Sequence, residues 1–274
     1  MTAAPPSRPR LVLLHGGGTD HRLWAPVLPR LAPHFDTLAP DLPGHGDEPA
    51  PPEPSVEGVA RAIAPRLAAR LGTAPYALLG HSFGAMVAMA LASTALAPPT
   101  HLVLADPFLR PATGIDRTVR MWALEVGARL LGSRNAARVG LERMGVDRAP
   151  PDDPLRLSME HPHAWPMHRM LRAHRRFDGR PHLARVRCPT LALMAGGSPA
   201  TDGEGERLAR AVADGHVEIM PRVGHLQMRD DPDGFAAAVI RFVLGPDAAA
   251  PLTPPRSPAP GTAPGAPRAA ASSR

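Results

Sequence analysis

The chain has 274 residues, of which 44% are hydrophobic, and its formal net charge of +6 includes no lysine, because every basic side chain other than histidine is arginine. This length and apolar content suit one large domain, or one domain with an insertion. The arginines are scattered, aromatic residues make up only 4%, and no nucleic-acid-binding motif is present, so we expect no nucleic-acid partner.

Short apolar runs alternate with helical patterns along most of the chain. We expect strands over residues 11–14, 36–40, 76–79, 101–105, 190–194 and 217–220. Helices are expected over residues 23–31, 56–71, 85–92, 208–212 and 235–244. Strands that alternate with helices imply βαβ units, so the sequence predicts an α/β fold with a parallel sheet.

Three segments depart from this alternation. Residues 108–186 show helical patterns and no strand candidate, so we interpret them as an insertion into a core formed by residues 10–107 and 187–245. Residues 1–9 are proline-rich and are expected to be loose. Residues 246–274 are dominated by Pro and Ala, which predicts a disordered tail without a catalytic role.

The pentapeptide Gly80-His81-Ser82-Phe83-Gly84 lies between an expected strand and an expected helix. A Gly-x-Ser-x-Gly turn in this setting holds its serine in a strained backbone conformation, with the hydroxyl clear of the sheet at a helix N-terminus. Gly80 and Gly84 lack the side chains that would clash at so sharp a turn. The pattern therefore predicts Ser82 as a nucleophile.

A serine hydroxyl is a weak nucleophile unless a base takes its proton. His225 follows the last expected strand, which is where this architecture carries its histidine. We expect the N–H groups of Phe83 and Gly17 to form an oxyanion hole, because Phe83 follows the nucleophile and Gly17 follows the first strand. The run His15-Gly16-Gly17-Gly18 lacks the glycine pattern and the lysine of a nucleotide-binding loop.

These motifs make the sequence similar to the α/β-hydrolase superfamily, in its cap-bearing branch with a serine nucleophile. The matching pieces occur in family order over residues 10–245: His15–Gly18, Asp41-Leu42-Pro43-Gly44-His45-Gly46, Gly80–Gly84 and Gly224-His225. The resemblance implies a mostly parallel sheet with helices on both faces. It also implies a helical cap at residues 108–186 and a sheet with shortened N-terminal strands, since only nine residues precede Arg10.

The acid of the triad departs from the commoner family pattern. Most members carry it as Gly-x-x-Asp after the strand expected at 190–194, but Pro199 occupies that position here and Asp202 follows three residues later. Some branches place the acid at the end of the strand after the nucleophile helix, where this chain has Asp106. We favour Asp106 and keep Asp202 as the alternative.

The sequence thus predicts a serine hydrolase that cleaves an ester-type bond of a small, partly apolar substrate through an acyl-enzyme. The same triad supports C–C bond hydrolysis, thioester hydrolysis or acyl transfer, and a catalytically inactive ligand-binding relative also stays open. Trp24, Trp122 and Trp165 are the candidate substrate-binding residues.

We expect no metal and no cofactor, because the histidines near residues 161–168 have no Cys or carboxylate at ligand spacing. The N-terminus has no apolar signal-peptide core, and the single Cys188 cannot form an internal disulfide. We therefore expect a cytoplasmic enzyme with a small-molecule substrate and no membrane partner, of unknown oligomeric state.

Overall fold

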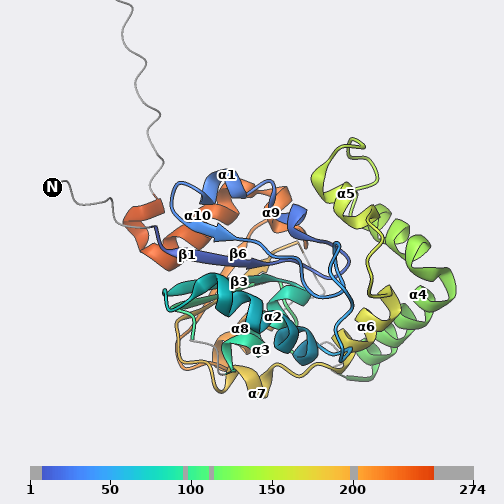
Figure 1. Ribbon diagram of the computed structural model, residues 1–274, viewed down its shortest axis with the longest axis horizontal. Helices are drawn as coiled ribbons and strands as arrows, with labels where there is room; N and C mark the ends of the chain where they lie inside the picture. The colour runs from blue at the N-terminus through green and yellow to red at the C-terminus, as the bar shows by residue number, and fades with distance from the viewer. Residues whose placement is uncertain (1–7, 95–97, 111–113, 198–202, 250–274) are drawn as a thin grey trace, which may run out of the picture.

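The core of the protein is one six-stranded sheet. The computed structural model describes residues 8–94, 98–110, 114–197 and 203–249 (Figure 1). All neighbouring strands pair in parallel, in the order β2-β1-β3-β4-β5-β6. The strands are β1 (Arg10–Leu14), β2 (Asp36–Leu38), β3 (Tyr76–His81), β4 (His101–Ala105), β5 (Thr190–Ala195) and β6 (Gly215–Met220). The predicted α/β fold with a parallel sheet is confirmed.

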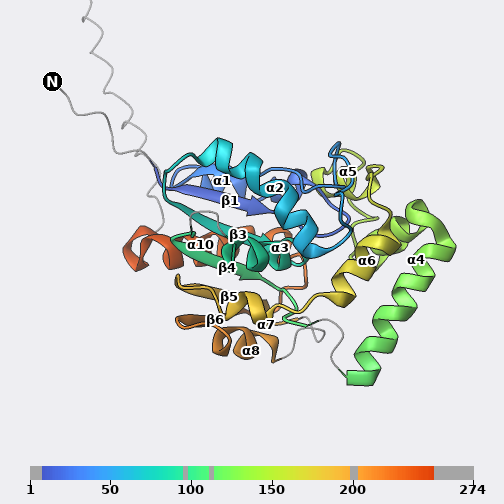
Figure 2. The same ribbon diagram turned by 60° about the horizontal axis from the view of Figure 1, so that its bottom comes forward.

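Helices cover both faces of this sheet (Figures 1 and 2). One face carries α2 (Val56–Leu71), α3 (Phe83–Ala92), α7 (Arg180–Leu183) and α8 (Glu204–Arg210). The other face carries η1 (His21–Trp24), α1 (Leu28–Leu31), α9 (Gln227–Asp230) and α10 (Pro232–Leu244), and η3 (Pro246–Ala249) follows.

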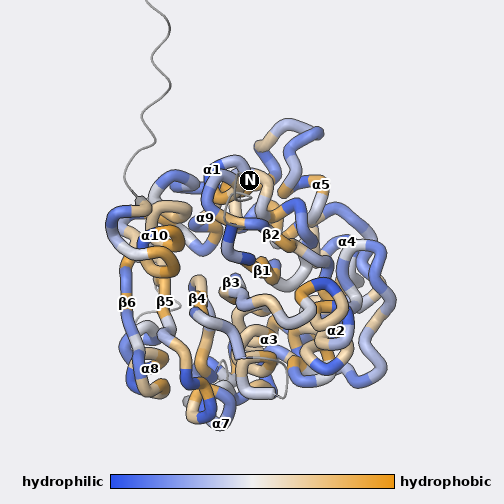
Figure 3. Tube along the Cα trace, turned by 60° about the vertical axis from the view of Figure 1, so that its left-hand side comes forward, coloured by the Kyte–Doolittle hydropathy of each residue, from blue (hydrophilic) through white to orange (hydrophobic). Residues whose placement is uncertain are grey.

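Successive residues of each strand point to opposite faces of the sheet. Val12 and Leu14 therefore pack against α2 and α3, whereas Leu11 and Leu13 join the cluster around α10. Burial on both faces explains why the central strands read as unbroken apolar runs, which Figure 3 shows as orange segments.

A helical segment lies between β4 and β5 in the sequence. It contains α4 (Gly114–Arg143), α5 (Pro154–Glu160) and α6 (Met167–Arg176), followed by α7. Helix α4 is bent at Gly132, whose φ of +76° glycine adopts readily. Figure 2 shows α4 and α6 side by side at the end of the sheet where the strands finish. This placement is compatible with a cap, and the exact domain boundaries stay a prediction.

The helix expected over residues 23–31 is replaced by the shorter η1 and α1. Pro26 and Pro29 lack the N–H groups that a continuous helix would need. Within the described ranges, no helix combines the length and apolarity needed to cross a bilayer. The cytoplasmic location stays a prediction, and the loose N-terminus and most of the tail, residues 1–7 and 250–274, lie outside the described residues.

Candidate active site

The order of the strands creates a crevice at the carboxyl ends of the central strands. The chain adds β2 on one side of β1 and then β3 on its other side, so the strand order reverses at β1 and β3. Ligands of open α/β sheets bind outside the carboxyl ends of the strands at such a switch point. The glycine run follows β1 and Ser82 follows β3, so both predicted motifs lie at this crevice.

Ser82 occupies a strained turn between β3 and α3. Its φ of 52° and ψ of −115° are unfavourable for a residue with a side chain. A Cβ at Gly80 would lie 2.4 Å from the carbonyl oxygen of Gly84, and a Cβ at Gly84 would lie 2.3 Å from that of His15. Two glycines are therefore required for the close approach that presents Ser82 at the N-terminus of α3, as predicted.

A chain of hydrogen bonds joins Ser82, His225 and Asp106. Ser82 Oγ lies 3.0 Å from His225 Nε2, and His225 Nδ1 lies 2.5 Å from Asp106 Oδ2. Since the carboxylate accepts a hydrogen bond from the Nδ1–H group, Nε2 is left as the acceptor for the serine hydroxyl. The structure thus brings together the predicted nucleophile and base with the favoured acid.

Asp106 is completely buried at the end of β4. Its φ is +46°, and its second carboxylate oxygen accepts a hydrogen bond of 3.2 Å from the N–H of Ala195. Three residues other than glycine have positive φ in the described part of the chain, namely Ser82, Asp106 and Arg222. Two of the three belong to this constellation, where such strain often concentrates. Asp202 lies outside the described residues.

The loop that carries His225 is held by two contacts that the sequence does not predict. His81 Nε2 donates to the carbonyl oxygen of His225 over 2.8 Å, and the two rings lie 4.7 Å apart. The carboxylate of Asp230 accepts the N–H of Gly224 at 2.7 Å. From the sequence, Asp230 is expected only as a helix cap, and the His81 side chain is expected to point away from the nucleophile. Both residues lie close to the motifs in the sequence, but that closeness does not reveal which groups they contact.

Gly17, in the glycine loop after β1, lies beside Phe83, the first residue of α3. A Cβ on Gly17 would be 3.3 Å from Phe83 Cβ and 2.7 Å from the sulfur of Met170. The loop is fixed because Thr19 Oγ1 donates to the carbonyl of Gly16, and His15 accepts the N–H of Leu42. This arrangement is compatible with the oxyanion hole that the sequence predicts, whose function stays a prediction.

A cavity of about 740 Å³ opens next to this loop, beneath α4 and α6. Trp165, Met167 and Met170 line it, and the Trp165 ring lies 5.8 Å from the Phe83 ring. Trp24 is instead fully buried against Phe235, and Trp122 is 57% exposed on α4. Neither of them lines this cavity, and the substrate-binding role of all three tryptophans stays a prediction.

Several buried histidines near the site are held uncharged. Burial, assisted by nearby His225, lowers the pKa of His81 to about 3, and the same two causes lower the pKa of His174 on α6 to about 4. Burial also lowers the pKa of His15 to about 4. These rings therefore add no positive charge beside the hydrogen-bond chain near pH 7.

One group of potential metal ligands occurs among the described residues, formed by Asp20, His21 and Asp41. Asp20 pairs with Arg22 at 2.5 Å, and His21 Nδ1 lies 2.9 Å from Asp41. These contacts already satisfy the group, and the absence of a metal stays a prediction.

Comparisons with known proteins identify the family of the chain. A pimeloyl-[acyl-carrier protein] methyl ester esterase of Neisseria meningitidis is 27% identical over 252 residues, which cover 88% of this chain and 96% of the relative. An N-formylmaleamate deformylase of Pseudomonas putida is 29% identical over 241 residues, covering 86% and 89%. The crystal structure of a Pseudomonas aeruginosa hydrolase superposes with a TM-score of 0.74 at 26% identity, covering 88% and 91%. Residues 11–238 match the model of the alpha/beta hydrolase family, and the chain belongs to that family.

Proposed function

We propose that the protein is a serine hydrolase that cleaves carboxylic ester-type bonds of small molecules. The observation that carries this proposal is the hydrogen-bond chain from Ser82 through His225 to Asp106. The esterase and deformylase names of the relatives support the same reaction class.

In the first half of the reaction, Ser82 Oγ attacks the acyl carbonyl carbon while His225 Nε2 accepts the hydroxyl proton. The buried carboxylate of Asp106 stabilises the resulting imidazolium and holds its Nδ1–H. The N–H groups of Gly17 and Phe83 stabilise the negative charge on the tetrahedral oxygen. His225 then protonates the alcohol as the C–O bond breaks, leaving an acyl-serine.

In the second half, His225 accepts a proton from water, which attacks the acyl carbonyl carbon. Collapse of the second tetrahedral intermediate releases the acid and returns the proton to Ser82 Oγ. The segment between β4 and β5 covers the crevice, and we assign it the role of a cap that selects the substrate.

Replacement of the nucleophile tests the proposal. Ser82→Ala is expected to lower kcat for a p-nitrophenyl ester by at least about 10,000-fold, because no acyl-enzyme forms. Ser93→Ala is the matched control, since Ser93 follows the other end of the same helix and contacts Ala90 and His182. A fluorophosphonate probe should label the parent and Ser93→Ala but not Ser82→Ala. Full esterase activity in a folded Ser82→Ala variant would contradict the proposal.

A further inference from the structure

Strand β6 presents an open row of backbone groups at one edge of the sheet. It is the last strand in the sheet order and pairs with β5, and Figure 3 shows it at the outer edge. The carbonyl oxygens of Asp214 and Met220 accept N–H groups from the β5 side, each over 2.9 Å. Because alternate residues of a strand direct their backbone groups to opposite sides, those of Gly215, Val217 and Ile219 point away from the sheet. No described residue forms a hydrogen bond with these outward groups.

The two edges of the sheet differ in how well they are protected. Natural proteins protect edge strands by keeping them short or by placing charged side chains or proline on them. Strand β2, at the other edge, has three residues and begins with the exposed Asp36. Strand β6 has six residues, of which Val217 is 38% and Ile219 57% exposed, and its one carboxylate, on Glu218, binds Arg241 of α10 at 2.6 Å. A longer edge with exposed apolar side chains favours pairing with another strand.

The sequence of β6 is complementary to itself when two copies run antiparallel. A register centred on Val217 places Gly215 opposite Ile219 of the second copy, so that the outward backbone groups of both strands meet. The glycine leaves room for the isoleucine side chain on that face of the strand. On the other face, the imidazole of His216 lies opposite the carboxylate of Glu218 of the second copy, which is a favourable cross-strand pair.

Neighbouring registers are less favourable. A register centred on His216 sets two imidazoles against each other and leaves Ile219 without a partner strand. A register centred on Glu218 sets two carboxylates against each other, which is destabilising, and leaves Gly215 unpaired. The side chains of β6 therefore specify the register centred on Val217.

We infer that two copies of this chain associate through β6, joining their sheets into one continuous sheet across a twofold axis. A twofold interface uses the same patch on both copies, as this self-complementary edge does. Main-chain hydrogen bonds provide affinity in such strand pairing, and the side chains on either face provide specificity. Strands β4 and β5 separate β6 from β3, which leads to Ser82, so the pairing leaves the active-site crevice open.

The mass of the full chain in solution tests this inference. Sedimentation equilibrium at tens of micromolar protein should show a species of twice the monomer mass of 28.9 kDa. Val217→Lys brings two like charges together at the twofold axis and should weaken the dimer by about tenfold or more. Circular dichroism and thermal unfolding would verify that this variant is folded. A parent chain that stays monomeric, or a dimer unaffected by Val217→Lys, would overturn the inference.

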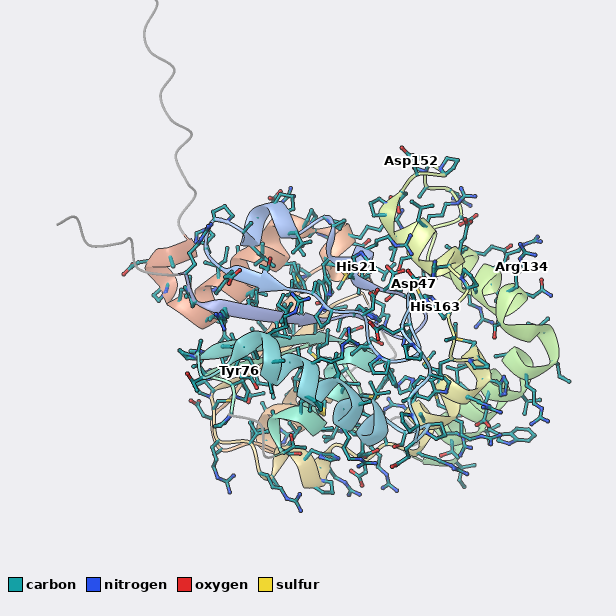
Figure 4. The ribbon with its side chains drawn as sticks, in the orientation of Figure 1. His21, Asp47, Tyr76, Arg134, Asp152 and His163 are labelled. Carbon is teal, nitrogen blue, oxygen red and sulfur yellow. The ribbon has the colours of Figure 1, made fainter. Side chains whose placement is uncertain are left out.

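Helix α4 provides the matched control, because it also carries exposed apolar side chains. Figures 2 and 3 show α4 on the opposite side of the molecule from β6, and Figure 4 marks Arg134 on this helix far from Tyr76, which begins β3. Leu130 is 81% exposed on α4, so Leu130→Lys makes a similar change there and should leave the dimer intact. A dimer that dissociates in Leu130→Lys and persists in Val217→Lys would place the contact on α4 and contradict the inference.

A second variant should strengthen the dimer, an effect that a damaged fold cannot produce. His216→Lys places a permanent positive charge opposite Glu218 of the second copy and should lower the dissociation constant by about two- to fivefold at neutral pH. A dimer weakened by His216→Lys would contradict the register centred on Val217.

Cross-linking tests the geometry directly. In a Cys188→Ser background, Val217→Cys places two thiols opposite each other, and a short bifunctional thiol reagent should join most of the chains in pairs. Leu130→Cys should remain largely uncross-linked under the same conditions. Equal cross-linking of the two variants would count against pairing at β6. Neither this readout nor the mass depends on turnover, so loss of the proposed esterase function would leave both unchanged.

Discussion

At the scale of single residues, His81 is the neighbour that best explains how His225 is held. Its Nε2–H bonds the His225 carbonyl, and its buried ring stays neutral because burial lowers its pKa to about 3. We expect His81→Leu to lower kcat about tenfold with a smaller change in KM, because a small displacement of the base misaligns proton transfer. His81→Gln, which can place a donor near the same carbonyl, should recover most of kcat. Equal losses in two folded variants would rule out this positioning role.

Asp106 provides the second test at this scale. In Asp106→Asn the amide would donate to His225 Nδ1, so the ring proton would move to Nε2 and Ser82 would lose its acceptor. We expect kcat for a p-nitrophenyl ester to fall by roughly 1,000- to 10,000-fold while the protein stays folded by circular dichroism. Asp202→Asn should change kcat little. The opposite pattern, a silent Asp106→Asn and an inactive Asp202→Asn, would move the acid to Asp202.

The sequence indicates Ser82 and His225 because each follows a strand within a local motif. Asp106 is harder to choose, because its reach to His225 depends on how β4 lies between β3 and β5. The role of His81 escapes sequence reasoning for a related reason, because its partner on the His225 loop is 144 residues away in the sequence. A long-range contact of this kind produces no periodic sequence pattern. The contact of Asp230 is local, only six residues from Gly224, but carboxylates near a helix start are also expected as helix caps.

At the scale of secondary-structure elements, the turn from β3 to α3 depends on missing side chains. Gly84→Ala would place a Cβ 2.3 Å from the carbonyl oxygens of both Leu14 and His15, which belong to the backbone and cannot rotate away. We expect a loss of at least about 2 kcal/mol in the free energy of unfolding. Urea denaturation would measure it, and an unchanged midpoint would show that the turn relaxes.

Gly127 is the matched control for this substitution. It lies within α4 and has helical backbone angles, and a Cβ added to it would meet no described atom within 4 Å. Gly127→Ala should therefore stabilise the protein by up to about 1 kcal/mol, because alanine favours the helix. A loss of stability in this variant would mean that the Gly84→Ala result does not report on crowding alone.

The positions of the strands and helices are largely predictable, because the signals that mark them are local in the sequence. Runs such as Leu102–Ala105 are buried on both faces, so hydrophobicity alone marks them. Helix α2 begins at a Ser55 cap and ends at Gly72, and both signals are local. The prediction for the segment around Pro26 and Pro29 is wrong because hydrophobic spacing there is helical while the missing N–H groups prevent a long helix.

At the scale of the whole molecule, one buried carboxylate joins the two main helices of the segment proposed as a cap. Glu125 on α4 is 5% exposed and binds Arg172 at 2.5 Å and Arg175 at 2.9 Å, both on α6. Helix α6 also carries Met170 to the glycine loop, so the ion pairs connect cap packing to the shape of the active site.

Glu125→Gln is expected to destabilise the cap by about 1–2 kcal/mol at pH 7, since the partly exposed arginines lose a charged partner. Thermal unfolding and hydrogen exchange in α4 and α6 would report the loss. Glu142→Gln makes the same change in an exposed pair with Arg138, 3.3 Å apart, and should have little effect. Equal effects of the two substitutions would mean that burial of Glu125 adds nothing.

The contribution of Glu125 should also depend on pH. Burial opposes ionisation of Glu125, but hydrogen bonds from Arg172 and Arg175 outweigh it, so the pKa falls below the ordinary value of 4.5. A lowered pKa in the folded state means that the stabilisation is complete above pH 4.5 and is lost as the pH falls through the folded-state pKa. The difference in unfolding free energy between the parent and Glu125→Gln should therefore be constant from neutral pH to about pH 5 and shrink in stronger acid. A difference that grows on acidification would show that the carboxylate is not held ionised by the two arginines.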